Sequence, residues 1–298
     1  MNIRLIILFF FSMGLLAKAQ VSQAQTEVID SLKKVIKNAK HDTARINAWR
    51  AWDNIIYLSN PDLDIRLNEK IDSISSTNLS KKLNQKERVK FLKSKGSALN
   101  NFGIIYTNKG NYAKAVNCYN ESLKIFKELD NTFAVAVTLN NIGNIYKEQG
   151  NYTTALKYYN ESLKLYDELN DKIGKSQALN NIGLVYAETE EYPYAVEYHT
   201  KSLEIHEELD NIGGVSQSLN NLGVVYEKQQ LYNKAIEFYT KSLEIQEKLG
   251  DKRVIAATFL NISLICNKQG EYKKALKNKK KYLKKAKEIK DEVIIKDA

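Results

Sequence analysis

Apolar residues recur along this chain in a pattern that repeats every 40 positions. Within one copy they fall at helical spacing twice, first at Leu139, Ile142 and Ile145 and then at Ala155 and Tyr159. Each copy is therefore predicted to be a hairpin of two antiparallel helices. The most regular part of the pattern reads LNNFGIIY, LNNIGNIY, LNNIGLVY, LNNLGVVY and FLNISLIC, at residues 99–106, 139–146, 179–186, 219–226 and 259–266.

A hairpin of this size cannot bury its own apolar face. Consecutive copies must therefore stack and share one continuous core. The predicted fold is all-α, a right-handed superhelical solenoid of antiparallel helix hairpins, with five copies over residues 85–290. Residues 20–84 are less regular but still helical, and we interpret them as an N-terminal helical cap with a degenerate repeat over 42–76. Residues 291–298 are assigned as a C-terminal tail.

Turn residues mark the ends of the predicted helices. A glycine can adopt the left-handed conformation that ends a helix, and an asparagine after it can cap the next one. Two of the turns within copies have this pair, Gly110-Asn111 and Gly150-Asn151. Two others have Glu190-Glu191 and Gln230-Leu231 instead, and these turns are expected to be less well capped. The breaks between copies are predicted at Asp130-Asn131, Asn170-Asp171, Asp210-Asn211 and Gly250-Asp251.

A glycine recurs inside the first helix of the first four copies, where it costs about 1 kcal/mol relative to alanine. We expect the compensation to be a close approach of the two helices of a hairpin. The glycines are Gly103, Gly143, Gly183 and Gly223, and the small residues expected opposite them are Ala115, Ala155, Ala195, Ala235 and Ala275. The tyrosines expected to fill the wider gap beside them are Tyr106, Tyr146, Tyr186 and Tyr226.

The first 19 residues have the pattern of a secretory signal peptide. Arg4 precedes an almost wholly apolar run, Leu5–Leu16, and Ala17-Lys18-Ala19 supplies a cleavage site before Gln20. The run is shorter than the roughly 20 residues that span a bilayer. An uncleaved membrane anchor is the alternative. We expect an exported protein, periplasmic or secreted, without stable membrane insertion after cleavage.

The combination of an apolar residue, Gly and Tyr in the first helix with Ala and an aromatic residue in the second resembles the tetratricopeptide repeat. The resemblance covers about residues 85–290, with a period longer than the usual 34 residues. In its period and LNN-x-G core the chain is most similar to the kinesin-light-chain-like subgroup. Together with the signal peptide, it also resembles exported sensor regions of bacterial signalling proteins.

The fifth copy differs from the others because its second helix loses the aromatic residues of its outer face. Asn278 and Lys279 stand where earlier copies have Tyr158 and Tyr159. Such a change is expected where no further repeat stacks, so the array is predicted to end here in a soluble cap. Truncation of a longer signalling protein is the alternative.

The formal net charge of +10 raises the question of a polyanionic partner. Much of the excess lies in the last helix, at Lys273, Lys274, Lys277, Lys279, Lys280, Lys281, Lys284, Lys285, Lys287 and Lys290. A solvated face is the first interpretation and an anionic envelope surface the second. Export removes the chain from most nucleic acid, so no nucleic-acid partner is expected.

Residues for catalysis or metal binding are few. His199 and His206 lie seven positions apart on one helix, too far to share an ion easily, and they occupy columns filled by aromatic residues in other copies. The acidic residues form no recurrent inward pair. Cys118 and Cys266 lie in different copies and are predicted to be apolar fillers rather than a disulfide. We expect no enzyme, no metal and no cofactor.

Asparagine pairs recur in the first helix although asparagine is a mediocre helix former. The resemblance implies that the second member contacts the backbone of an extended peptide, at Asn101, Asn141, Asn181, Asn221 and Asn261. We also assign the first members to the site, at Asn100, Asn140, Asn180 and Asn220. Recent duplication of the repeat and hydrogen bonds between neighbouring helices are the two alternatives to peptide binding. Specificity is expected from variable positions such as Val137, Gln177 and Gln217, or Ile104, Asn144, Leu184 and Val224, or Asn108, Glu148, Glu188, Lys228 and Lys268.

The sequence thus predicts a non-enzymatic module that binds an extended peptide or protein segment in a concave groove. One alternative is a sensory input module that acts with a separate membrane-bound kinase or regulator. The other is an envelope scaffold or oligomer that uses the lysine-rich end.

Overall fold

The computed structural model describes residues 23–56 and 60–296, and the regular structure in these residues is entirely helical. The predicted signal peptide lies outside them. The helices run as α2 (Gln23–Asn38), α3 (Asp42–Ile56), α4 (Pro61–Leu79), α5 (Gln85–Asn108), α6 (Tyr112–Glu128), α7 (Thr132–Glu148), α8 (Tyr152–Glu168), α9 (Lys172–Glu188), α10 (Tyr192–Glu208), α11 (Ile212–Lys228), α12 (Tyr232–Leu249), α13 (Lys252–Lys268) and α14 (Tyr272–Lys296).

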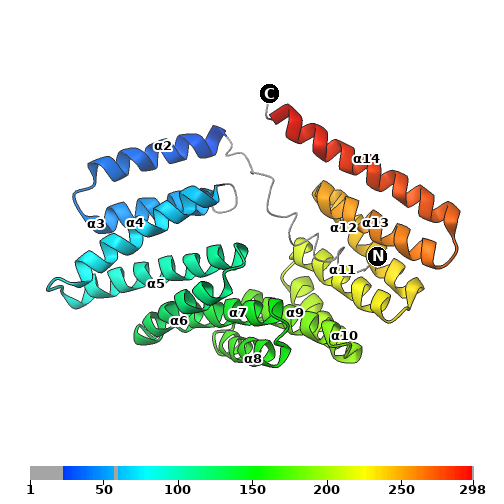
Figure 1. Cartoon of the computed structure of the whole chain (residues 1–298), viewed down its shortest axis with the longest axis horizontal. Coiled ribbons are helices and arrows are strands. Elements are labelled where there is room, and N and C mark those ends of the chain that lie inside the picture. Colours follow the sequence, from blue (N-terminus) through cyan, green and yellow to red (C-terminus); the bar gives the residue numbers. More distant parts are fainter. Residues whose placement is uncertain (1–22, 57–59, 297–298) are drawn as a thin grey trace. The chain divides into compact units, whose positions relative to one another are not determined.

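Helix hairpins are the unit of the fold, as the 40-residue pattern predicts. The first helices of the five copies are α5, α7, α9, α11 and α13, and each is followed by its second helix (Figure 1). The chain divides into two compact units, Met1–Asn141 and Ile142–Ala298, which are described separately below. None of the described helices is both long and apolar enough to cross a membrane.

The turns within copies confirm the predicted caps. Gly110 and Gly150 have φ of 71° and 73°, and the Asn111 side chain accepts a hydrogen bond from the backbone N–H of Lys114. Glu190 and Gln230 adopt the same left-handed region, with φ of 64° and 61°, although they are not glycine. The residues after them make no side-chain cap hydrogen bond. These two turns are therefore less well capped, as expected.

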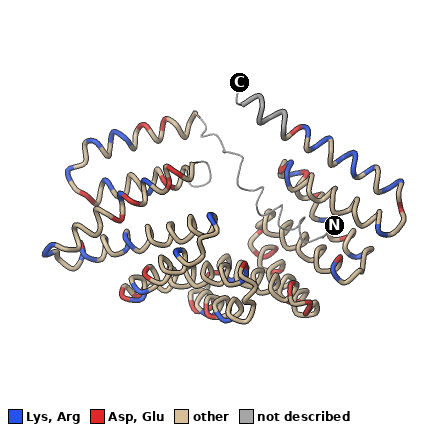
Figure 2. The backbone as a smooth tube through the Cα atoms, in the orientation of Figure 1, with Lys and Arg blue, Asp and Glu red and all other residues tan. Residues whose placement is uncertain are grey.

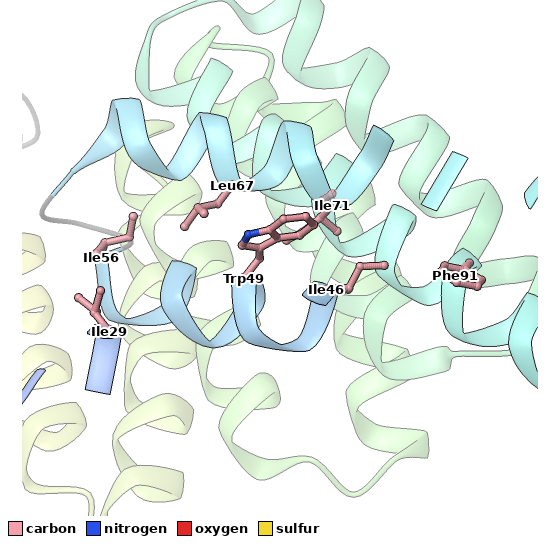
Figure 3. Close-up of a cluster of buried hydrophobic side chains, with 8 residues drawn as sticks. Ile29, Ile46, Trp49, Ile56, Leu67, Ile71 and Phe91 are labelled. Carbon is pink, nitrogen blue, oxygen red and sulfur yellow. The ribbon is translucent and has the colours of Figure 1, made fainter. Parts of the chain in front are cut away.

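Helices α2, α3 and α4 of the first unit share a buried apolar cluster with Phe91 and Ala98 of α5. Ile29 of α2, Ile46 and Trp49 of α3, and Leu67 and Ile71 of α4 are buried in one cluster. Figure 3 shows the Trp49 ring between α3 and α4 beside Ile71. The tryptophan is thus a packing residue.

The recurring glycines do make close contacts between the helices of a hairpin, but their predicted alanine partners are wrong. A Cβ atom at Gly143 would lie 2.6 Å from the ring of Tyr159. Ala155 packs instead among Ile182 and Val185 of the next first helix. The same relation joins Gly103 to Tyr119, Gly183 to His199 and Gly223 to Tyr239. The glycine is needed because an aromatic ring of the second helix lies against the backbone of the first.

The tyrosines of the first helices stack on aromatic residues of the second. Tyr146 and Tyr158 have ring centroids 5.5 Å apart with nearly parallel planes. Tyr226 stacks on Phe238 in the same way at 5.2 Å. Both cysteines are free, and Cys266 is buried beside Ala235 and Ile262, which agrees with a packing role.

Candidate functional site

Four positions of each first helix share one side of that helix. On α5 they are Ser97, Asn101, Ile104 and Asn108, whose spacing of four, three and four residues follows the helical repeat. We call this side, and its equivalents on α7, α9 and α11, the first-helix face. Gln177 and Gln217 are exposed at the position of Ser97, and the equivalent asparagines are half-buried.

The asparagines of consecutive first helices bond to one another. In the second unit, Asn221 Nδ2 donates to Asn180 Oδ1 at 2.6 Å, and the same oxygen lies 3.1 Å from His199 Nδ1. In the first unit, Asn141 Nδ2 donates to Asn100 Oδ1 at 3.4 Å. In both links the first asparagine of one repeat accepts from the second asparagine of the next. Hydrogen bonding between neighbouring helices was one of the alternatives to peptide binding. It engages one of the two polar groups of each amide, the Oδ1 of the accepting asparagine and the Nδ2 of the donating one.

The other half of these amides has no partner within the described residues. Asn100 Nδ2 and Asn180 Nδ2 donate no hydrogen bond there, and Asn141 Oδ1 and Asn221 Oδ1 accept none. Each linked pair therefore offers one donor and one acceptor. These two functions match a peptide group, whose C=O accepts a hydrogen bond and whose N–H donates one.

The remaining predicted asparagines lie in different surroundings. Asn140 is buried, with 9% of its surface exposed. Asn181 and Asn220 are half-buried on α9 and α11. Asn261 forms a side-chain hydrogen bond with Tyr239. The nine asparagines are therefore not equivalent, although the sequence repeats them.

A cavity of about 210 Å³ lies in the first unit at the asparagine pair of α5. Both Asn100 and Asn101 line it, together with Ser97 and Thr138. Its apolar lining includes Phe133, an α7 side chain that is 55% exposed. The other lining residues are Arg50, Asp53, Asn54, Asn68, Ile71, Ser94, Ala98, Phe126, Ala134 and Val137.

Two buried carboxyl groups lie close together at this cavity, and one of them, Asp53, also lines it. Asp53 of α3 and Asp64 of α4 are 3% and 2% exposed, and Asn68 Nδ2 donates to both, at 3.1 and 2.7 Å. Asn101 Nδ2 donates to Asp53 Oδ2 at 3.0 Å. Burial, then the hydrogen bond and charge of Asp53, raise the pKa of Asp64 to about 8. Burial also raises the pKa of Asp53. The pair therefore shares a proton at neutral pH.

This pair was not predicted from the sequence, because neither acid recurs from copy to copy. A signal was present in α4, where Asp64, Asn68 and Ile71 follow the spacing of a buried helix face. Asp53 lies in α3 just after the half-buried Trp52. A search for polar residues in apolar positions of the non-repeating region finds both.

Several positions expected to give specificity are already engaged within the chain. Lys228 Nζ lies 3.0 Å from Glu188, and Lys268 Nζ lies 3.0 Å from Glu227. Asn144 Oδ1 accepts the hydroxyl of Tyr159 at 2.7 Å. Val137, Gln177 and Gln217 remain as variable positions without such bonds.

His199 packs against Gly183 in the way that Tyr159 packs against Gly143. His199 is fully buried, which lowers its pKa to about 4, and its ring lies against Gly183. Among the described residues, no group of three His, Cys, Asp or Glu side chains is placed to hold a metal ion.

The repeat pattern also matches a known family. The family model described as "Tetratricopeptide repeat" matches residues 94–168, 134–208 and 214–288, more than half of the chain. The chain belongs to the tetratricopeptide repeat family. No curated protein matches it in sequence.

Several solved tetratricopeptide-like structures share the fold. BtubC (BKLC) from P. vanneervenii has 18% sequence identity and a TM-score of 0.67, over 77% of this chain and 92% of that one. A Rap protein complexed with competence and sporulation factor has 14% identity and a TM-score of 0.60, over 90% and 77%. A signal transduction ATPase with a tetratricopeptide repeat sensor from Pyrococcus horikoshii has 17% identity and a TM-score of 0.68, over 92% and 42%.

At these identities the likeness concerns the fold alone. Tetratricopeptide arrays are protein–protein interaction modules, and this chain has that architecture in both of its units.

A second cavity, of about 420 Å³, lies in the second unit between α8, α9 and α10. Its lining combines apolar residues with the ion pair of Lys175 and Asp167, whose charged atoms are 2.6 Å apart. The sequence analysis did not anticipate this cavity. It is separate from the first-helix face, since Tyr198, Lys201, Glu204 and Ile205 of the second helix α10 form one wall.

Proposed function

We propose that this tetratricopeptide protein is a non-enzymatic module that binds an extended peptide segment along the first-helix face. The observation that carries the proposal is the cavity of about 210 Å³ at Asn100 and Asn101, because it combines unsatisfied amide groups with apolar side chains in one concave site. Most of the residues that line it are polar or charged, which suits a ligand bound chiefly through its backbone hydrogen-bonding groups.

The backbone of the segment bonds to the amides. Asn100 Nδ2 has no acceptor within the described residues, and Asn101 Oδ1 has no donor there. The two amides lie on adjacent residues and both line the cavity. One backbone C=O and one N–H of an extended chain satisfy them whatever the side chains of the segment are. Phe133 and Val137 add an apolar contact that selects among side chains.

In the second unit, the Asn180–Asn221 link corresponds to the Asn100–Asn141 link of the first. Asn180 Nδ2 and Asn221 Oδ1 again remain unsatisfied within the described residues, and the exposed Gln177 and Gln217 lie one turn before the second asparagine of each repeat. The second unit therefore also offers a donor and an acceptor that suit the backbone of a peptide. The Rap protein of similar fold was crystallised with competence and sporulation factor, which supports a bound partner for this architecture.

The test begins with a selection of random linear peptides displayed on phage against the full chain. Hydrogen exchange of the chain with an enriched peptide then locates the site. We expect slower exchange in α5 and α7, because the peptide covers their exposed side. Failure to enrich any peptide, or protection confined to the second helices α6 and α8, would contradict the proposal.

We further propose that the module acts outside the cytoplasm, after removal of residues 1–19. The support is the sequence pattern of Arg4, Leu5–Leu16 and Ala17-Lys18-Ala19. A membrane-bound signalling protein is then one possible source of the peptide segment. Expression in a bacterium, cell fractionation and mass spectrometry test the localisation. We expect an extracytoplasmic protein that starts at Gln20, whereas a cytoplasmic protein that retains residues 1–19 would contradict it.

A further inference from the structure

Helix α14 holds most of the excess positive charge of the chain. Its residues 272–289 include nine lysines and a single acidic residue, Glu288, whereas the whole chain has a formal charge of +10. Figure 2 shows these lysines following one another along the helix. The remainder of the chain is therefore nearly balanced in charge.

The same helix exposes apolar side chains. Tyr272, Leu276 and Leu283 are 69%, 55% and 54% exposed. Their spacing of four and seven residues places them on one side of the helix. In the preceding repeat, Leu243 holds the position of Leu283 and is only 9% exposed, because it packs against Ile255 and Phe259 of α13.

The exposed side of α14 is thus the side that other second helices use to contact the next repeat. Within the described residues no first helix follows α14. About a quarter turn from this line, Ala275 is buried against α13 of its own hairpin, and on the far side Lys281 Nζ lies 4.8 Å from the ring centroid of Phe259.

Four lysines lie beside the exposed apolar line. At 3.6 residues per turn, Lys273, Lys279, Lys280 and Lys287 project within about a quarter turn of it. All four are exposed, and none forms an ion pair with another described residue. The lysines that do form ion pairs, Lys274 and Lys285, lie on the far side.

We propose that this side of α14 docks on an anionic phospholipid bilayer. The charge of the lysines is complementary to lipid phosphates, and Leu276, Leu283 and Tyr272 reach the apolar edge of the headgroup layer. Helix α14 contains no arginine, the residue that grips single phosphates in a bidentate manner and dominates recognition of nucleic acid. Lysines combined with exposed leucines favour a lipid surface over nucleic acid.

Co-sedimentation with vesicles tests this docking. The probes are vesicles of phosphatidylcholine alone and of phosphatidylcholine with about one third phosphatidylglycerol. We expect the full chain to sediment with the second type only. Affinity is expected to fall at least about tenfold between roughly 0.05 M and 0.5 M salt, because salt screens the lysines.

Three sets of variants locate the surface. Replacement of Lys273, Lys279, Lys280 and Lys287 by glutamine is expected to abolish sedimentation. The matched control replaces four exposed lysines of α6 and α8, Lys124, Lys127, Lys157 and Lys164, and is expected to retain it. Leu276→Ser with Leu283→Ser is expected to weaken binding several-fold without changing the net charge. Circular dichroism confirms that each variant is folded.

Three results would overturn the proposal. They are equal sedimentation with both vesicle types, equal loss in the control set of lysine variants, and tighter binding to a DNA duplex than to the anionic vesicles at equal phosphate concentration. The docking surface on α14 shares no residue with the first-helix face. A variant that abolishes vesicle binding therefore leaves the peptide-binding proposal open to its own test.

Discussion

Asn221 donates its side-chain N–H to Oδ1 of Asn180, 2.6 Å away, and so links the first helices of two consecutive repeats. Asn141 and Asn100 form the same link in the first unit at 3.4 Å. These two linked pairs therefore serve the stacking of repeats with one part of their amides. The other part remains available for a ligand.

Replacement of Asn221 by alanine is expected to destabilise the fold by about 1–2 kcal/mol, because Asn180 Oδ1 loses its shortest hydrogen bond in a half-buried place. Asn220, its neighbour in the sequence, makes no hydrogen bond within the described residues and is the matched control. Asn220→Ala is expected to change stability by less than about 0.5 kcal/mol. Urea unfolding followed by circular dichroism measures both. Equal effects of the two substitutions would contradict the link.

Adjacent glycines of α11 are expected to respond in opposite ways to alanine. A Cβ atom at Gly214 would collide with the ring of His206, whereas one at Gly213 has no neighbour closer than 3.7 Å. Gly214→Ala is therefore expected to cost about 1–3 kcal/mol. Gly213→Ala is expected to be neutral or to stabilise the helix by up to about 1 kcal/mol. Melting temperatures of the two variants decide, and a stabilised Gly214→Ala would refute the close packing.

The turn at Glu190 offers a stabilising substitution. Glu190 has a φ of 64°, in the left-handed region where Gly150 and Gly270 occupy the same column of the repeat. Glu190→Gly is expected to stabilise the protein by about 1 kcal/mol, since glycine adopts this conformation without a steric penalty. Gly150→Glu is the reverse change, and a Cβ atom there meets nothing within 4 Å. It is expected to destabilise by a similar amount in the same urea assay. Effects of the same sign would rule out a backbone origin.

The buried carboxyl pair makes stability depend on pH. The folded chain keeps a proton at Asp64 up to a pKa of about 8, whereas the unfolded chain releases it near 4. The free energy of unfolding is therefore expected to fall as pH rises from about 4 to 8, by at most about 1.4 kcal/mol per pH unit from this group.

Asp64→Asn provides the comparison for this pH dependence. The amide mimics the protonated carboxyl and keeps the oxygen that accepts from Asn68. The variant is expected to show a flatter dependence than the wild type and to be the more stable protein at pH 8. Parallel curves of melting temperature against pH for the two proteins would show that Asp64 is not protonated in the folded state.

The features that could be predicted from the sequence are those that recur in every repeat or depend on neighbouring residues. Turns such as Gly110-Asn111 were predictable because glycine and asparagine act locally. The partner of Gly143 was not, since Ala155 and Tyr159 are four residues apart and share one helix face, so periodicity cannot say which of them meets the glycine. The Ser202 hydroxyl, which donates to the backbone oxygen of Ser176, was also missed. A small polar residue buried between helices has no pattern of its own.

The candidate site was only partly predictable for a related reason. Asn100 and Asn101 stand out because they recur, and the cavity does include them. Asp53, Asp64 and Asn68 belong to the non-repeating cap, where no second copy reveals which positions are unusual. These three side chains come together because α3 packs on α4, and no local sequence pattern predicts that packing.

The affinity of a phage-selected peptide for Ser97→Trp tests the central claim most directly. Ser97 lines the cavity and its hydroxyl bonds only to the backbone of its own helix, so an indole there blocks the site without breaking links between repeats. Asn117→Trp places the same bulk on an exposed position of α6 outside the cavity and serves as the control. We predict at least about a tenfold loss of affinity, or 1.4 kcal/mol, for Ser97→Trp alone. Unchanged affinity, or an equal loss in both variants, would contradict peptide binding at the first-helix face.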